Sequence, residues 1–210
     1  MIFLVYVDNE IDNHELLKQS AALTCKKFTF FERRTYGRSL AESKRGEIFT
    51  TKDSMRPISH LQSNETLYVV GHGDRERTLL SGLSPLELAD LLQSHGLNLH
   101  TKYLKIHLVC CHSGHKKSGL HLSFAEQLYL ILLSTINPLN KHHMEKEGSL
   151  LRMKAPKHLI GFRPQDGIAI GIKPKDYDEY QQTKAQSPTQ SEEWLKEHVT
   201  ALSCSDFQLI

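Results

Sequence analysis

Short apolar runs that alternate with helical patterns are the feature that most limits the fold of this chain. Continuous apolar runs lie at Ile2 to Val7 and Thr66 to Val70, and a third strand pattern lies at Tyr103 to Cys110, with Leu104, Ile106 and Leu108 on one face. Runs of this length and composition are typical of strands that are buried in a parallel sheet. A helical pattern at residues 12–25 and others farther along separate them, so we predict an α/β three-layer sandwich with a mostly parallel central sheet.

Two of the helical patterns carry complete start signals. Ser84 precedes Pro85 and stands three residues before Glu87, and Ser123 stands three residues before Glu126. A serine and a glutamate at this spacing satisfy the free backbone amides of a first helical turn, an arrangement called the capping box. We therefore expect helices to begin at these two serines. The second helix is apolar nearly all round, which predicts that it is deeply buried.

The rest of the chain suggests one main domain with a C-terminal appendage. We predict a domain over residues 1–172, with an irregular basic insertion at 32–65 and a flap hairpin within 150–172. The hairpin is indicated by two short apolar runs around a Pro-Gln-Asp-Gly turn, between His158 and Ile172. Residues 173–210 are mostly polar, and we expect a polar tether followed by a C-terminal helix.

Composition and charge narrow the class of protein. The chain has 26 Lys and Arg residues and 24 Asp and Glu residues, and a net charge of +2 does not indicate nucleic-acid binding. No apolar run approaches the roughly 20 residues that span a bilayer, and the N-terminal run lacks the features of a signal peptide. The four cysteines follow no disulfide spacing. We expect a soluble monomer in a reducing compartment, either cytoplasmic or delivered into a host cell by a non-Sec route.

An acid, an imidazole and a thiol follow the three predicted strands. Asp8 follows the first strand, His72 follows the second within Gly-His-Gly, and Cys111 follows the third. Parallel strands end at a common edge of the sheet, where active sites of α/β folds lie. A thiolate nucleophile, an imidazole that transfers protons and a carboxylate that orients it form a cysteine hydrolase site. The amides of Gly73 and Cys111 are candidate oxyanion donors, and Cys110, which points to the opposite face, is assigned to the core.

The stretches LYVVGHGD and IHLVCCHSG resemble the histidine and cysteine motifs of the caspase-like (clan CD) cysteine peptidases. The nearest likeness is to the self-processing cysteine protease domains of MARTX and large clostridial toxins, where stretches like LLSGLSPLELADLL and SFAEQL follow in the same order. The resemblance implies a caspase-like fold and a cysteine endopeptidase, with Cys111 as nucleophile, His72 as catalytic histidine and Asp8 as the acid. It also implies a toxin or effector protease involved in virulence, which cleaves after a small apolar residue.

The same resemblance implies an activator, although no required cofactor. The predicted hairpin from His158 to Ile172 resembles the β-flap of the toxin domains, which orders when it binds inositol hexakisphosphate. Polyphosphates need clustered cations, although a solvated charged face would carry the same residues. The candidates are Arg152, Lys154, Lys157, Arg163, Lys173 and Lys175.

Two features depart from the toxin domains. Cys110 replaces the small residue that precedes their nucleophile. Met1 stands directly before the first strand, which leads us to expect cleavage of a separate protein substrate rather than self-processing.

Two other interpretations stay open at this level. A structural zinc-binding domain is one, although adjacent ligands on an extended chain point apart, which disfavours a shared metal. A catalytically inactive module of the same fold that binds polyanions or proteins is the other, because a fold does not determine a function. The residues that suggest zinc are Cys110, Cys111, His112, His115, His121, His142 and His143.

Overall fold

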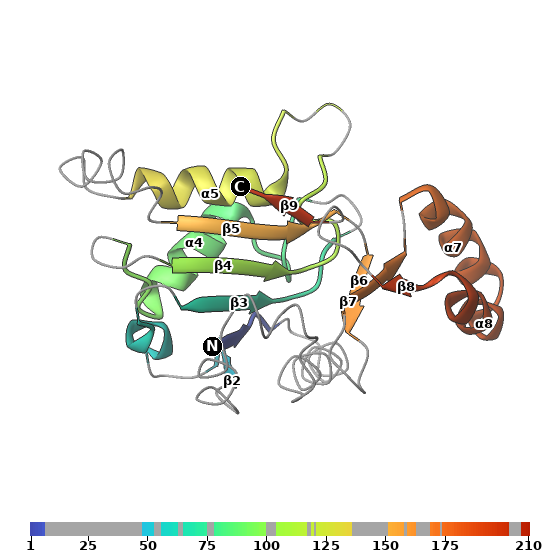
Figure 1. Cartoon of the computed structure of the whole chain (residues 1–210), viewed down its shortest axis with the longest axis horizontal. Helices are drawn as coiled ribbons and strands as arrows, with labels where there is room; N and C mark the ends of the chain where they lie inside the picture. The colour runs from blue at the N-terminus through green and yellow to red at the C-terminus, as the bar shows by residue number, and fades with distance from the viewer. Residues whose placement is uncertain are drawn as a thin grey trace.

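A six-stranded sheet with strand order β2-β1-β3-β4-β5-β9 forms the centre of the computed structural model (Figure 1). The first five strands in this order run parallel, and β9 runs antiparallel to β5. Their bounds are β1 (Ile2–Leu4), β2 (Ile48–Thr50), β3 (Thr66–Val70), β4 (Leu104–Val109), β5 (Leu151–Pro156) and β9 (Phe207–Leu209). The structure describes residues 1–6, 48–52, 56–62, 65–74, 78–99, 104–116, 119, 121–135, 151–157, 159–162, 169–172, 174–201 and 207–210.

A small second sheet follows β5 in the chain. It has the order β6-β7-β8, with strands β6 (Leu159–Phe162), β7 (Ala169–Ile172) and β8 (Thr200–Ala201), all antiparallel. β6 and β7 pair antiparallel within the range 158–172, where the sequence predicts a hairpin. The first part of the predicted flap range 150–172 belongs to the main sheet, because 151–154 pair in register with β4 and 154–156 pair with β9.

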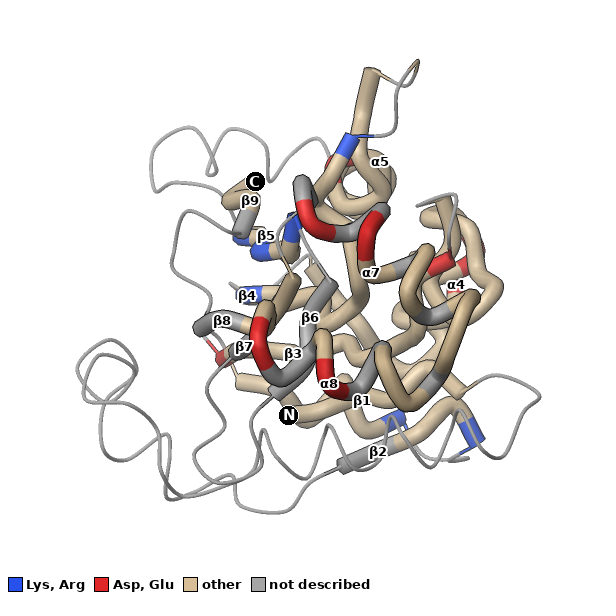
Figure 2. Tube along the Cα trace, turned by 90° about the vertical axis from the view of Figure 1, so that its right-hand side faces the viewer, with Lys and Arg blue, Asp and Glu red and all other residues tan. Residues whose placement is uncertain are grey.

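Two helices take the place of the predicted polar tether. They are α7 (Pro174–Gln186) and α8 (Pro188–His198), and both begin at a proline, which suits the first turn of a helix. Trp194 holds them together: its indole N–H donates to Glu179 at 3.1 Å, and its ring lies 5.7 Å from that of Tyr180. Figure 1 places this pair beyond the carboxyl ends of β3, β4 and β5, and Figure 2 shows it in front of that edge of the sheet.

The region predicted as an irregular basic insertion, residues 32–65, contains regular structure. Within it the structure describes β2, which pairs with β1, and the short helix η1 (Pro57–His60). β2 is only three residues long, and its pairing with a strand more than 40 residues away in the chain stabilises it. Such a contact leaves no periodic signal in the sequence.

The helices α4 (Pro85–Ser94) and α5 (Phe124–Ser134) begin as predicted. Ser84 and Ser123 are their N-caps, and the capping boxes with Glu87 and Glu126 are both complete. The prediction that α5 is buried all round is only partly right. Leu128 and Leu132 are fully buried, whereas Leu130 is 51% exposed.

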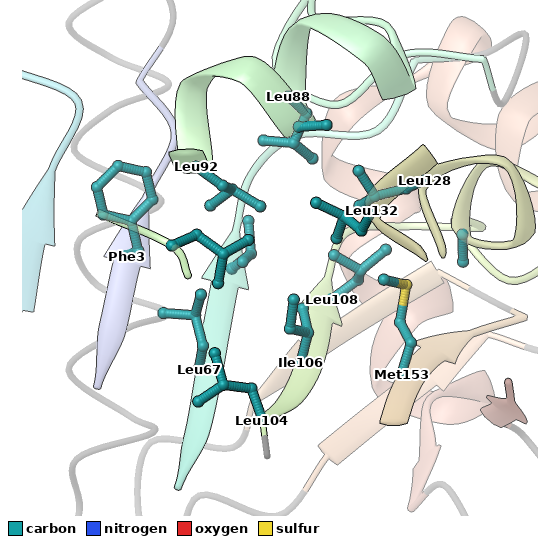
Figure 3. Close-up of a cluster of buried hydrophobic side chains, with 14 of the residues drawn as sticks. Phe3, Leu67, Leu88, Leu92, Leu104, Ile106, Leu108, Leu128, Leu132 and Met153 are labelled. Atoms are coloured by element: carbon teal, nitrogen blue, oxygen red, sulfur yellow. The ribbon is translucent and has the colours of Figure 1, made fainter. Parts of the chain in front are cut away.

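The main core lies between the sheet and these two helices (Figure 3). Alternate residues of the strands, such as Leu67, Ile106 and Met153, point toward Leu88 of α4 and Leu128 of α5. A smaller apolar cluster occupies the opposite face of the sheet, around Ile2, Leu4, Val70 and Val109. The α/β prediction with a mostly parallel sheet is confirmed. The helical pattern predicted at 12–25 lies outside the described residues.

Over the part of the chain that the structure describes, no helix has both the length and the apolar character that crossing a bilayer requires.

Candidate active site

His72 and Cys111 follow neighbouring strands of the main sheet. β3 and β4 are parallel, with Val70 opposite Val109, and the Gly71 amide continues the ladder by donating to the Val109 carbonyl at 3.2 Å. Each site residue stands two positions beyond the Val70–Val109 pair, at the carboxyl edge of the sheet. Asp8, the third predicted member, lies outside the described residues.

Ser81 holds the backbone of His72 on both sides. The His72 amide donates to the Ser81 hydroxyl at 3.0 Å, and the Ser81 amide donates to the His72 carbonyl at 2.6 Å. Ser81 is buried and has a φ of 49°, an unusual left-handed conformation for a residue other than glycine. The sequence analysis did not single out Ser81. Its position before Gly82 in an LLSGLS turn was the available signal.

Asp74 closes the loop that follows His72. Its carboxylate accepts hydrogen bonds from the amides of Thr78 and Leu79 at 2.7 and 2.8 Å, and from the Thr78 hydroxyl at 3.0 Å. These bonds fix Asp74 to Thr78 and Leu79, the residues that precede Leu80 and Ser81. Sequence reasoning missed this role, since an aspartate after a Gly-His-Gly motif has many possible uses.

Gly73 lies directly against the backbone of Cys111. A Cβ atom at Gly73 would collide with the Cys111 carbonyl oxygen and would lie 3.2 Å from the Cys110 sulfur. Gly73 also lies opposite Leu80 in a short antiparallel pair. The hydrogen bonds on either side of this pair run from the Asp74 amide to the Leu79 carbonyl and from the Ser81 amide to the His72 carbonyl. In such a pair the central amide points away from the partner strand. The Gly73 amide is therefore directed away from Leu80.

The two adjacent cysteines occupy different environments. Cys110 is 2% exposed and belongs to the main core, as predicted. Burial, followed by the neighbouring Cys111 and Asp74, raises the pKa of the Cys110 thiol well above its ordinary value, so a reactive thiolate is strongly disfavoured there. Cys111 is partly exposed. Of the two cysteines, Cys111 is the one that reaches the surface.

The turn that carries Cys111 is attached to α5 and to β5. The Ser113 hydroxyl donates back to the Cys110 carbonyl at 2.9 Å, and the Ala125 amide at the start of α5 donates to the Ser113 carbonyl at 3.0 Å. The Gly114 amide donates to the carbonyl of Pro156 at 2.8 Å. These bonds hold the turn at the edge of the sheet.

The helix α7 approaches Cys111 from the C-terminal part of the chain. Burial, and then the charge of Cys111, raise the pKa of the Tyr180 phenol above its ordinary value. This agrees with the position of α7 beyond the strand ends in Figures 1 and 2. The polar composition of residues 173–193 had suggested a tether, so a residue near Cys111 was not expected from this segment.

The structure describes the side chains of three of the six predicted polyphosphate-binding residues. Arg152 and Lys154 lie on the face of β5 that points away from α4 and α5, and Lys157 follows the strand. Arg163 and Lys173 lie outside the described residues, and Lys175 stands in the first turn of α7 with its side chain outside them.

Two basic residues of β4 that the sequence analysis did not select lie beside this group. Lys105 is opposite Arg152, and His107 is opposite Lys154, on the same face of the sheet. Burial, followed by the charges of Lys154 and Lys105, lowers the pKa of His107 to about 3. The alternation of Lys105 and His107 with buried leucine and isoleucine was the signal that could have identified this face.

Across the described residues, no three His, Cys, Asp or Glu side chains come together as ligands of a metal ion. His142 and His143, which the zinc interpretation would use, lie outside those residues.

The comparison with protein families agrees with this geometry. The model of the Peptidase C80 family matches residues 34–137, about half of the chain, and this range includes both His72 and Cys111. A search of curated proteins found no match. The chain is a member of the Peptidase C80 family, the clan CD cysteine peptidases of MARTX and clostridial toxins, and is therefore a hydrolase that acts on peptide bonds.

Proposed function

We propose that the chain is an endopeptidase of the toxin or effector type, with Cys111 as its nucleophile and a separate protein as its substrate. The observation that carries this proposal is the parallel register of β3 and β4, which brings His72 and Cys111 to adjacent strand ends with Gly73 against the Cys111 backbone. The partial exposure of Cys111 and the burial of Cys110 support the choice of thiol.

In the proposed reaction the Cys111 thiolate attacks the scissile carbonyl and forms a tetrahedral intermediate. The amides of Gly73 and Cys111 donate hydrogen bonds to its oxyanion. His72 protonates the leaving amine as the C–N bond breaks, which leaves a thioester on Cys111. Water then attacks the thioester, loses a proton to His72 and releases the new carboxylate together with the thiolate. Asp8 is proposed to orient the His72 ring.

Labelling with a leucyl acyloxymethyl ketone tests this assignment, because only a reactive thiol that binds an apolar residue beside it is alkylated. The thiolate forms a thioether with the methylene carbon of the probe and displaces the carboxylate. We expect stoichiometric labelling of the wild-type protein, complete loss in Cys111→Ala, and retention in Cys110→Ala, measured by intact mass. Because Cys110 is buried beside Cys111, its variant is the matched control. Equal labelling of the two variants would contradict the proposal and favour the inactive binding module.

We also propose inositol hexakisphosphate as an activator of the peptidase. The support is a basic face of the sheet, formed by Lys105 and His107 on β4 and by Arg152 and Lys154 on β5. Beside it lies Lys157, which stands between β5 and β6 and is here called the root of the β6–β7 hairpin. Like charges on neighbouring strands repel one another, and a bound polyanion would offset that repulsion. A ligand on this face would contact the strand that leads directly into the hairpin.

His107 is expected to report this binding through its pKa. Without ligand it stays neutral to about pH 3, so between its ordinary pKa of 6.5 and that value the folded protein binds fewer protons than the unfolded chain. Stability therefore falls as the pH falls through this window. Bound hexakisphosphate offsets the charges of Lys154 and Lys105 and should raise the pKa of His107 by about one unit or more. Burial, the largest cause, remains.

Histidine resonances in an NMR pH titration measure this shift. The exposed His60 serves as the internal control, and its resonances should not change when the ligand is added. Arg152→Ala should weaken hexakisphosphate binding in calorimetry while leaving the pKa of His107 in the ligand-free protein unchanged, because Arg152 is not among the causes of its shift. Binding that leaves His107 unaffected would place the ligand elsewhere.

A further inference from the structure

The residue after the proposed nucleophile has an unusual backbone conformation. His112 has a φ of 59°, in the left-handed region, and is 4% exposed. Among the described residues, Ser81 is the other non-glycine residue with a positive φ, and it holds the backbone of His72. Such conformations cost free energy, persist only where the surroundings enforce them, and concentrate at active sites. Each adjoins one of the two proposed catalytic residues: Ser81 binds the backbone of His72, and His112 follows Cys111 in the chain.

The conformation of His112 determines where the Cys111 carbonyl lies. The peptide group between the two residues turns with the ψ of Cys111 and the φ of His112. Its carbonyl oxygen is the atom that packs against Gly73, whose amide is a proposed oxyanion donor. If His112 relaxed to a negative φ, this peptide group would rotate and the contact with Gly73 would change.

The imidazole of His112 attaches this turn to the hairpin root. Its Nδ1 atom lies 3.2 Å from the carbonyl oxygen of Lys157. A carbonyl only accepts, so Nδ1 carries the proton and donates it. The adjacent carbonyl of Pro156 accepts from the Gly114 amide at 2.8 Å. Two consecutive carbonyls, one at the last residue of β5 and one at the residue after it, therefore hold the turn on either side of Ser113.

We propose that His112 is a positioning residue of the peptidase, which fixes the Cys111 turn to the root of the β6–β7 hairpin. The inference rests on the proposed role of Cys111 as nucleophile. It implies that a displacement of the hairpin root would reach the nucleophile through one side-chain bond and one backbone bond. His112 touches neither the substrate nor the reacting atoms, so its effect is on geometry.

Three substitutions separate the two features of His112. Asparagine tolerates a left-handed φ, and its side-chain amide reaches about as far as Nδ1, so His112→Asn keeps both features. His112→Gly keeps the backbone conformation and loses the bond to Lys157. His112→Ala loses the bond and is strained. His115→Ala is the matched control, because His115 lies on the same turn with its ring 6.4 Å from that of His112.

The measurement is kcat for peptide hydrolysis per active site, with active sites titrated by the acyloxymethyl ketone so that unfolded protein is not counted. We expect His112→Asn and His115→Ala to stay within about threefold of wild type. His112→Ala should lose about 10- to 100-fold in kcat with little change in KM, and His112→Gly should lie between. If His112→Ala does not fold, the contrast between the glycine and asparagine variants decides the matter.

Wild-type kcat in His112→Ala, or in His112→Gly where the alanine variant does not fold, would overturn the proposal. So would an asparagine variant as slow as the glycine one, because the imidazole would then act in another way. The Cys111→Ala control keeps the two proposals distinct. Hydrolysis that survives in Cys111→Ala refutes the nucleophile assignment itself, whereas hydrolysis that is lost there but unaffected by His112 substitutions refutes only the positioning role.

Discussion

Replacing His72 by Ala should lower kcat/KM for hydrolysis of an amide substrate by about 100- to 10,000-fold, the range expected for the loss of a general acid. His72 follows β3 as Cys111 follows β4, and Ser81 binds its backbone amide and carbonyl. An amine is a poor leaving group unless it is protonated as the C–N bond breaks. The measurement compares wild type with His72→Ala on a peptide library with an apolar residue before the scissile bond.

An ester of the same acyl group distinguishes the role of His72 in protonating the amine from a role in forming the thiolate. An alkoxide or carboxylate leaves more readily than an amine, so His72→Ala should impair ester hydrolysis and acyloxymethyl ketone labelling much less than amide hydrolysis. His121→Ala, at an exposed histidine near α5, is the control and should behave like wild type. An equal loss on amide and ester would show that His72 acts mainly on the thiol.

The position of His72 beside Cys111 could be predicted from the sequence because both follow strongly apolar strands. In a parallel sheet such strands end on one edge, so two motifs 39 positions apart in the chain could be placed together without any coordinates. The capping boxes at Ser84 and Ser123 were equally predictable, because the groups that form each hydrogen-bond pair lie within four residues of the chain. Local patterns and a simple topology were sufficient for these features.

The groups that support the site were not predictable in this way. The left-handed conformations of Ser81 and His112 depend on hydrogen bonds to residues elsewhere in the chain, and neither residue type by itself predicts a positive φ. The edge strand β9 is another example: Gln208 accepts a hydrogen bond at 3.0 Å from the hydroxyl of Ser123, 85 positions away in the chain. Such contacts form only when the fold brings distant parts of the chain together, so the local sequence does not predict them.

The helix α7 of the polar C-terminal segment was not predicted, for a related reason. Its composition is mostly polar and suggested a tether, but the packing of Tyr180 against Trp194 joins α7 and α8. The sequence predicted only part of the basic face formed by β4 and β5. The cations of β5 were selected from the sequence, whereas Lys105 and His107 became relevant only when the register of β4 against β5 placed them alongside.

Gly73→Ala should abolish most activity by a purely steric route. No left-handed φ requires glycine at this position, but the added methyl group would collide with the Cys111 carbonyl, which is backbone and cannot rotate away. The bonds of Ser113 to α5 and of Gly114 to β5 limit movement of the Cys111 turn. We expect a destabilisation of about 1–3 kcal/mol, as for other overpacked sites, and a fall in kcat of about 100-fold or more as the Gly73 amide and Cys111 separate.

Gly119→Ala is the matched control for this prediction. Gly119 is exposed, has a φ of 86°, and has open space where a methyl group would go, so its substitution costs backbone strain of about 1–2 kcal/mol without touching the site. The two variants should therefore lose similar stability in urea unfolding but differ by about 100-fold in kcat per titrated site. A Gly73→Ala protein that turns over like the Gly119→Ala protein would show that close approach of Gly73 to Cys111 is not required for hydrolysis, and the proposed oxyanion role of the Gly73 amide would then be wrong.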